Sequence, residues 1–301
     1  LRGCIGEDGL FRLPDDAERE RRVIQAARDC IRESYPELDA SPDELHTHLF
    51  RRYLAAARLM AASVTEELRH SKFVPAFFEK KIGDGDADIP PLDLTIASGR
   101  NAGKKLRLGG TVDRVDVFRR GEQLYLRVVD YKSGNHTFSM RDVKEGRDLQ
   151  LLLYLFTLCR GKDSAWFGDL PEGAELLPAG AFYLYMNREG QVPRPERSGL
   201  VVMDPELLHA MNDEMNSAFL CGVKEKKDGT YSGNAMESAD FDRLGDEIGD
   251  SLLSSADRLF SGDASKTPSA SILNGSVSPP PSALRTRRKC SPSSGRFLKI
   301  P

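Results

Sequence analysis

The sequence predicts an α/β fold in which a central mixed sheet is flanked by helices and preceded by a helical segment. Residues 105–119 and 123–132 are rich in β-branched and aromatic residues and are separated by a turn signal, which indicates a hairpin. Residues 179–186 form a continuous apolar run, which is typical of a central strand buried on both faces. Amphipathic stretches before and after these strands have helical spacing.

The helical segment at the start of the chain is predicted from spacing and from capping residues. Apolar residues recur at helical intervals over residues 15–34, and the pattern stops before Pro36. Residues 41–44 (Ser-Pro-Asp-Glu) combine an N-cap serine, a proline at the first helical position and a capping-box glutamate. We expect the second helix to run to about Arg69 with one apolar stripe, formed by Leu45, Leu49, Tyr53, Ala56, Met60, Val64 and Leu68.

The remaining elements divide the chain into three parts. Residues 83–91 contain Gly, Asp and Pro-Pro and are expected to form a loop, whereas 146–156, 205–221 and 246–261 are expected to be helical. Beyond Pro268 the chain is rich in Ser, Pro and Arg and loses periodicity, which predicts a disordered tail. We therefore expect a helical segment over 1–75 that is continuous with the main domain over 76–265, and a tail over 266–301.

Composition narrows the class of protein. The chain has 301 residues, 40% of them hydrophobic and 30% charged, with a formal net charge of -3. No apolar run has the length of a transmembrane helix and there is no signal-peptide pattern, so we expect a cytoplasmic protein. The five scattered cysteines fit a reducing compartment, and the absence of a Gly-x-x-x-x-Gly-Lys-Ser/Thr loop argues against ATP hydrolysis by this chain.

Two acids and a lysine are predicted to meet at one end of the hairpin. Asp113 follows Gly-Gly in the first strand, and Asp130 and Lys132 lie two apart in the second, so their side chains share a face while Tyr131 faces the other way. Two converging carboxylates can bind a hard cation such as Mg²⁺ or Mn²⁺ and leave positions for water and a phosphate. Lys132 would hold the attacking water or stabilise charge developing on phosphorus.

An acid-x-Lys triplet is common, and a solvated strand or helix face is the alternative interpretation. Asp142-Val-Lys144 is a second example in the same chain. Asp130 is favoured because it ends an apolar run and lies opposite a second acid. Further along, Gln150 and Tyr154 are spaced i,i+4 and therefore share one face of the predicted helix.

These three motifs resemble, in order and in sequence, the RecB-type branch of the PD-(D/E)xK nuclease superfamily. They are Gly-x-x-Asp-Arg-x-Asp (110–116), Asp-Tyr-Lys-Ser-Gly (130–134) and Gln-x-x-x-Tyr (150–154). Residues 124–154 are similar to the C-terminal nuclease domain of the AddB family, the B subunit of the ATP-dependent helicase/deoxyribonuclease. Shorter similarities near residues 71–79, 178–184 and 256–263 extend the resemblance over about 40–268.

The resemblance implies a restriction-endonuclease-like core and assigns roles by position. Asp113 and Asp130 would be metal ligands and Lys132 catalytic, with Gln150 and Tyr154 as the supporting motif. The backbone carbonyl of Tyr131 is a further candidate ligand, and Glu79 is a second-tier candidate that also fits an exposed strand. The implied partners are DNA and a helicase-nuclease A subunit, with no membrane.

The sequence departs from the family pattern in two functional features. No Gly-x-x-x-His helix precedes residue 105, and we expect His46 and His48 to be surface residues of a helix. The family's cysteines for an iron-sulfur cluster have no counterpart in spacing, so no cluster is expected from this chain. We also expect that the segment after Pro268 is not the family's natural ending, and that the chain, which begins at Leu1, is a fragment lacking the helicase-like part.

The predicted function is Mg²⁺-dependent hydrolysis of DNA phosphodiester bonds, serving as the exonuclease of a two-subunit helicase-nuclease in double-strand break repair and recombination. The first alternative is a catalytically inactive scaffold or DNA-binding module that keeps the fold. The second is a RecB-like nuclease of mobile-element or CRISPR-adaptation type. DNA contacts would depend on local patches such as Arg100, Lys104, Lys105 and Arg107, which could equally be a solvated edge.

Overall fold

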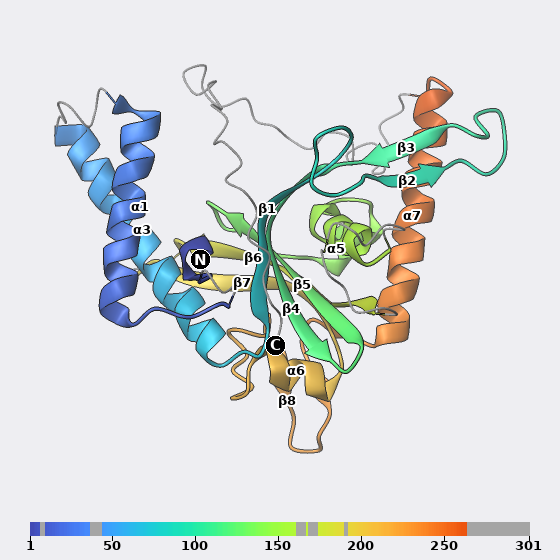
Figure 1. The fold of residues 1–301 in the computed structure, drawn as a ribbon. Coiled ribbons are helices and arrows are strands. Elements are labelled where there is room, and N and C mark those ends of the chain that lie inside the picture. The colour runs from blue at the N-terminus through green and yellow to red at the C-terminus, as the bar shows by residue number, and fades with distance from the viewer. Residues whose placement is uncertain (7–9, 37–43, 161–166, 168–173, 190–191, 264–301) are drawn as a thin grey trace.

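A mixed sheet forms the centre of the molecule (Figure 1). The computed structural model describes residues 1–6, 10–36, 44–160, 167, 174–189 and 192–263. Within them, six strands are ordered β1-β4-β5-β6-β7-β10. Their bounds are β1 Val74–Ile82, β4 Gly110–Arg120, β5 Gln123–Lys132, β6 Glu175–Asn187, β7 Arg194–Val202 and β10 Ala235–Met236. The predicted α/β fold with a central mixed sheet, preceded by a helical segment, is confirmed.

The hairpin of β4 and β5 is the part of the sheet that the sequence predicted best. The two strands are antiparallel, with Arg114 opposite Val129, and Gly121 in the turn has a φ of 63°, a conformation that glycine adopts without strain. The prediction of one strand over 105–119 was wrong at its start. β3 (Lys105–Leu108) pairs instead with β2 (Leu92–Thr95) in a separate two-stranded sheet, because the chain changes direction at Gly109.

The strand β6 confirms the predicted buried central strand. Residues 178–186 are buried, and β6 has neighbours on both edges, β5 in parallel and β7 antiparallel. A parallel neighbour requires a crossover, and the chain between β5 and β6 contains helices α4 (Met140–Lys144) and α5 (Gln150–Arg160). β10 adds a parallel edge strand beside β7.

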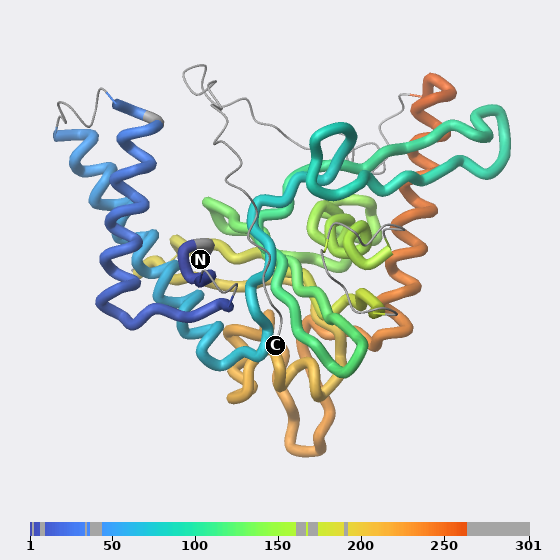
Figure 2. The backbone as a smooth tube through the Cα atoms, viewed as in Figure 1, coloured from blue at the N-terminus to red at the C-terminus, as the bar shows by residue number. Residues whose placement is uncertain are grey.

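Helices cover the sheet on opposite sides (Figures 1 and 2). The antiparallel pair α1 (Asp16–Ser34) and α3 (Glu44–Arg69) lies on one side, and α5 with α7 (Ser238–Phe260) lies on the other. The short 3-10 helix η1 (Arg2–Cys4), helix α6 (Pro205–Met211) and a small hairpin of β8 (Lys224–Glu225) and β9 (Tyr231–Ser232) complete the described elements. No helix among these residues is long and apolar enough to cross a membrane.

Three predicted helices have different bounds in the structure. The helix expected over 146–156 begins only at Gln150, because Gly146 and Asp148 have left-handed φ angles of 74° and 54°. The helix expected over 205–221 ends at Met211, where Asn212 turns to an extended conformation and its side chain accepts a hydrogen bond from the Asn216 backbone. The helix expected over 246–261 begins earlier, at Ser238.

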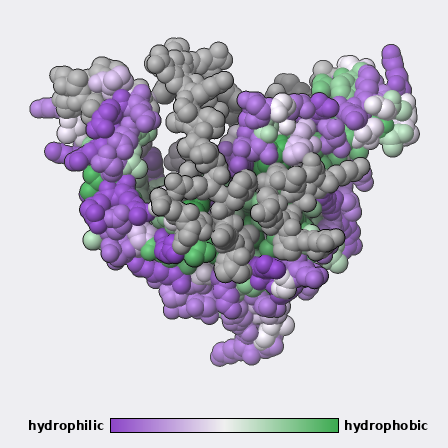
Figure 3. All heavy atoms as spheres, in the orientation of Figure 1, coloured by the Kyte–Doolittle hydropathy of each residue, from purple (hydrophilic) through white to green (hydrophobic). Residues whose placement is uncertain are grey.

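The first two helices match their predicted positions, but the stripe on α3 is only partly buried. Val64 and Leu68 are in the core, whereas Leu45 and Tyr53 are 63% and 65% exposed. The face in Figure 3 is mostly hydrophilic where α1 and α3 lie in Figure 1. Helical spacing identified the stripe correctly, but only its C-terminal half reaches the sheet. The expected division at residues 75 and 265 stays a prediction, and the expected tail lies outside the described residues.

An ionic cluster is buried between α3 and the sheet. Its members are fully or almost fully inaccessible to water: Glu67 on α3, Arg114 and Asp116 on β4, Arg127 on β5 and Arg197 on β7. Glu67 accepts hydrogen bonds from Arg114 at 3.1 Å and from Arg197 at 2.7 Å, and Asp116 accepts one from Arg127 at 2.7 Å. Buried charges persist only when they are paired, so this cluster fixes how α3 sits on three strands.

Glu67 is the carboxylate shared by the three arginines. Burial by itself would raise the pKa of Glu67, but the charges of Arg197, Arg127 and Arg114 outweigh burial and lower it to about 2. The ionised form is therefore favoured by folding. Its contribution to stability is present above the ordinary pKa of 4.5 and is lost as the pH falls toward 2.

We expect Glu67→Gln to lower the free energy of unfolding by about 3–5 kcal/mol at neutral pH, because it leaves buried arginines without their partner. The variant should also lose part of the acid dependence of stability between about pH 4.5 and pH 2. Urea denaturation at several pH values measures both effects. Glu66→Gln, whose side chain is 48% exposed, is the control and should shift stability by less than about 0.5 kcal/mol. Equal losses in the two variants would contradict the role given to the cluster.

Candidate active site

Asp113, Asp130 and Lys132 meet at one end of the β4–β5 hairpin. Because Arg114 pairs with Val129, the next residues along, Asp113 and Asp130, lie side by side on the opposite face of the two strands. Asp130 is 5% exposed and Asp113 is half-buried. The sequence predicted this convergence from alternation alone, and the structure brings the three side chains together.

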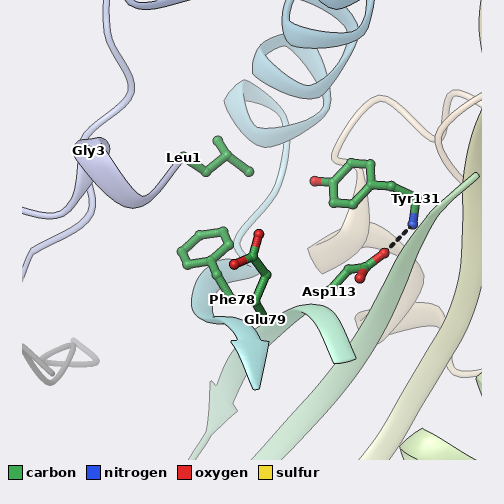
Figure 4. Close-up of a pocket in the computed structure, with 6 residues that line it drawn as sticks. All are labelled: Leu1, Gly3, Phe78, Glu79, Asp113 and Tyr131. Carbon is green, nitrogen blue, oxygen red and sulfur yellow. Dashed lines mark hydrogen bonds between the residues drawn. The ribbon is translucent and has the colours of Figure 1, made fainter. Parts of the chain in front are cut away.

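Each of the two carboxylates has a partner within the hairpin. The Lys132 ammonium lies 2.8 Å from Asp130 Oδ2, and the Tyr131 backbone N–H donates to Asp113 Oδ2 at 2.8 Å (Figure 4). Lys132 and Asp130 therefore share a face, as predicted. The Tyr131 hydroxyl lies on the other side, where it accepts a hydrogen bond from Arg114 at 2.9 Å.

The electrostatics of Asp113 favour a cation at this place. Burial is the main cause that raises the pKa of Asp113, and the charges of Asp130 and Glu79 raise it further. The Tyr131 N–H and the Lys132 charge act in the opposite direction without cancelling the rise. A divalent cation between the carboxylates would relieve the repulsion by Asp130 and Glu79, which is the smaller part of this rise.

Helix α5 supports Lys132 through two residues of the predicted motif. Lys132 donates to Gln150 Oε1 at 3.2 Å, and the Gln150 amide donates to the Tyr154 hydroxyl at 2.9 Å. That hydroxyl lies against Gly110 at the start of β4, where an added Cβ would overlap it. The helix and the first strand of the hairpin are thus joined at the candidate site.

Glu79 on β1 also faces the site. Its neighbours Phe78 and Lys80 pair with Arg114 and Val112, which places Glu79 opposite Asp113. The backbone φ of Glu79 is 51°, which is unusual for a residue other than glycine. Its carboxylate and that of Asp113 line one pocket (Figure 4). Within the described residues, however, no group of three or more His, Cys, Asp and Glu side chains is arranged to hold a metal ion.

The carboxylates of Asp113 and Asp130 fit a common kind of magnesium site. Mg²⁺ keeps several waters and is often bound by one or two carboxylates together with substrate phosphates. Asp113 and Asp130 supply such a pair, with their oxygens at the end of a rigid hairpin. The ligand roles of Asp113, Asp130 and the Tyr131 carbonyl stay predictions.

Sequence reasoning missed a polar group next to Lys132. The Tyr183 ring on β6 lies 5.2 Å from the Lys132 ammonium, and its hydroxyl donates to Asp148 at 2.6 Å. His136 lies 3.2 Å from the same carboxylate. Burial and the bond to Asp148 raise the pKa of Tyr183, so the phenol stays protonated. Tyr183 was hidden in an apolar run, and only the pairing of β5 with β6 reveals its position.

The structure also places the other residues that the sequence analysis considered for catalysis or DNA binding. Asp142 of the second acid-x-Lys triplet is bound by Arg147, and Lys144 is exposed on α4. In the proposed basic patch, Lys105 and Arg107 form ion pairs with Asp93, which favours the interpretation as a solvated edge. His46 and His48 lie on α3, and His48 is exposed as expected.

The profile of the PD-(D/E)XK nuclease superfamily matches residues 8–276. The chain therefore belongs to this superfamily, in agreement with the sheet, the paired acids and the lysine. Among curated proteins it is similar to the B subunit of the ATP-dependent helicase/deoxyribonuclease of several bacteria.

These relatives are much longer than the chain. The protein of Thermoanaerobacter sp. (strain X514) is 27% identical over 223 residues, which are 68% of this chain and 18% of the relative. The protein of Clostridium acetobutylicum is 30% identical over 217 residues, 66% of this chain and 18% of the relative. That of Ruminiclostridium cellulolyticum is 39% identical over 121 residues, 40% of this chain and 10% of the relative. The chain thus spans less than a fifth of their length.

We expect Gly110→Ala to displace Tyr154 and to lower stability by about 1–3 kcal/mol, because the new methyl group overlaps the Tyr154 hydroxyl and ring. Chemical denaturation measures the loss. Gly134→Ala is the matched control, since a Cβ there meets nothing within 4 Å. If the two alanine variants are equally stable, Gly110 is not needed for the contact between β4 and α5.

Proposed function

We propose that this chain is a Mg²⁺- or Mn²⁺-dependent nuclease that hydrolyses phosphodiester bonds of DNA. The observation that carries the proposal is the convergence of Asp113, Asp130 and Lys132 at one end of the β4–β5 hairpin. Membership in a nuclease superfamily and the word deoxyribonuclease in the name of the relatives support the same chemistry.

In the proposed reaction, each residue has a defined task. Asp113 and Asp130 hold the cation, which when bound lowers the pKa of water and offsets phosphate charge. The Lys132 ammonium orients the attacking water and stabilises the negative charge that grows on the phosphate oxygens. The water oxygen forms the new bond to phosphorus and gives up a proton to the solvent, while the bond to the leaving sugar oxygen breaks and that oxygen takes up a proton from the solvent.

Residues around Lys132 would keep its ammonium in place. Gln150 accepts one of its hydrogen bonds, and Tyr154 holds the Gln150 amide. A positioned charge acts on the transition state at little cost in reorganisation. Gln150 and Tyr154 are therefore proposed as positioning residues and not as groups that touch the reacting atoms.

We further propose that the chain is the exonuclease part of a cytoplasmic helicase-nuclease that works with an A subunit in break repair and recombination. Support comes from the name of the relatives, which describes each of them as one subunit of a helicase/deoxyribonuclease. The proposal includes no iron-sulfur cluster, because the five cysteines are widely scattered in the sequence and form no Cys-x-x-Cys pair.

A catalytically inactive DNA-binding or scaffold module is the second candidate. It is favoured by the lack of a third metal-ligating side chain beside Asp113 and Asp130 among the described residues. The two candidates differ in whether the cation leads to cleavage.

We expect Asp113→Ala, Asp130→Ala and Lys132→Ala each to lower the rate of DNA cleavage by at least about 100-fold, because each removes a group that acts on the transition state. Release of acid-soluble nucleotides from single-stranded DNA in Mg²⁺ or Mn²⁺ measures the rate, and EDTA should abolish it. Lys144→Ala should retain the wild-type rate. If Lys144→Ala loses as much activity as Lys132→Ala, the wrong acid-x-Lys triplet has been chosen.

A second test measures binding of the cation without DNA cleavage. The melting temperature of the wild type should rise with Mg²⁺ or Mn²⁺, because ligand that binds only the folded state stabilises it by RT ln(1 + [L]/Kd). Asp130→Asn keeps the shape of the side chain and should remove the shift. Asp142→Asn, in the other triplet, should keep it. Equal shifts in the wild type and Asp130→Asn would exclude the carboxylate pair as the cause.

A further inference from the structure

A pocket opens beside Asp113 on the side away from α5. Its volume is about 560 Å³, which lies within the range of small-molecule sites. It is lined by Leu1, Gly3, Phe78, Glu79, Asp113 and Tyr131. In Figure 4 the rings of Phe78 and Tyr131 stand on opposite sides of the Glu79 carboxylate, and the Asp113 carboxylate lies below the Tyr131 ring. The pocket therefore combines aromatic walls with a group that the proposed reaction uses.

The position of Tyr131 is fixed from two directions. Its backbone N–H donates to Asp113, and its hydroxyl accepts a hydrogen bond from Arg114 at 2.9 Å. Arg114 is itself fully buried, and its guanidinium lies 5.8 Å from the centre of the Tyr131 ring. Although Tyr131 is 38% exposed, its ring cannot turn freely without breaking the bond to Arg114. A ring held in this way loses little entropy when a ligand stacks on it.

The charges of the pocket select which part of a nucleotide can enter. Asp113 and Glu79 are carboxylates, so a phosphate without a cation is repelled from this space. A nucleobase is uncharged and flat, and bases stack on aromatic side chains with a substantial gain in affinity. A base that is paired inside a duplex does not present its face, so the fitting base is an unpaired one.

We propose that this pocket binds an unpaired nucleobase of the strand being cut, stacked on Tyr131 and facing Phe78, while the neighbouring phosphate lies at Asp113 and Asp130. The inference rests on the proposed nuclease function. It adds to that function a base-binding subsite beside Asp113. It also gives the buried ionic cluster a part in binding, because Arg114 sets the position of the stacking ring.

The test is a thermodynamic cycle in which Tyr131 of the protein and the bases of the DNA are removed separately and together. One arm compares wild type with Tyr131→Ala, and the other compares single-stranded DNA with an abasic strand of the same length and charge. Affinity is measured with Ca²⁺ in place of Mg²⁺ to prevent cleavage. Stacking on an aromatic side chain corresponds to about a 5- to 100-fold change in affinity. We expect a loss of this size for Tyr131→Ala on normal DNA and no further loss on the abasic strand.

Three variants make the cycle specific. Tyr131→Phe keeps the ring but loses the hydroxyl that Arg114 holds, so its affinity for normal DNA should lie between those of the wild type and Tyr131→Ala. Tyr53→Ala removes a tyrosine that is 65% exposed on α3 and should change nothing. If Tyr131→Ala fails to fold, Phe78→Leu takes its place in the cycle, with the same expected pattern.

The outcomes separate this inference from the function on which it rests. Equal losses for Tyr131→Ala on normal and abasic DNA, or equal affinity of the wild type for both strands, would overturn the stacking site while leaving the nuclease in place. A wild-type protein that neither binds nor cleaves DNA with Mg²⁺ or Mn²⁺ would overturn the proposed function and the inference together.

Discussion

The pairing of β4 with β5 is the constraint on which the candidate site depends. With Arg114 opposite Val129, one face of the two strands carries Asp113, Asp130 and Lys132. A slip of one residue in one strand would move every side chain of that strand to the opposite face, so the acids would no longer meet. The register is protected on the other face, where Asp116 lies opposite Arg127 and is bound by it.

The strands β4 and β5 carry residues of two ionic groups, the buried cluster around Glu67 and the candidate site, and the environments of the two groups differ. The cluster around Glu67 is sealed from water, its charges pair with one another, and the rings of Phe73 and Phe182 lie near Arg127. The candidate site is partly open, and the pKa of Asp113 is raised by burial and neighbouring acids. The closed cluster gives the hairpin rigidity, and the open one keeps carboxylates whose repulsion a cation can relieve.

Lys132 is contacted by its own strand and by two elements further along the chain. Asp130 contacts it within β5, Gln150 contacts it from α5, and the Tyr183 ring lies near it on β6. Asp148 and His136 extend this group beyond Tyr183. Such a setting limits where the ammonium can move, which suits a group that must act at one position on a phosphate.

The sequence by itself determined the hairpin, the paired acids and the lysine, because period-two alternation fixes which side chains share a face. It also determined the helices of the first segment and the buried strand β6, where spacing and apolar runs are local signals. Only the tertiary structure decided that residues 105–108 leave the hairpin, that Tyr183 lies beside Lys132 and that three arginines share Glu67. The first feature depends on pairing with the neighbouring strand β2, and the other two depend on contacts between segments far apart in the chain, which no local pattern of residues predicts.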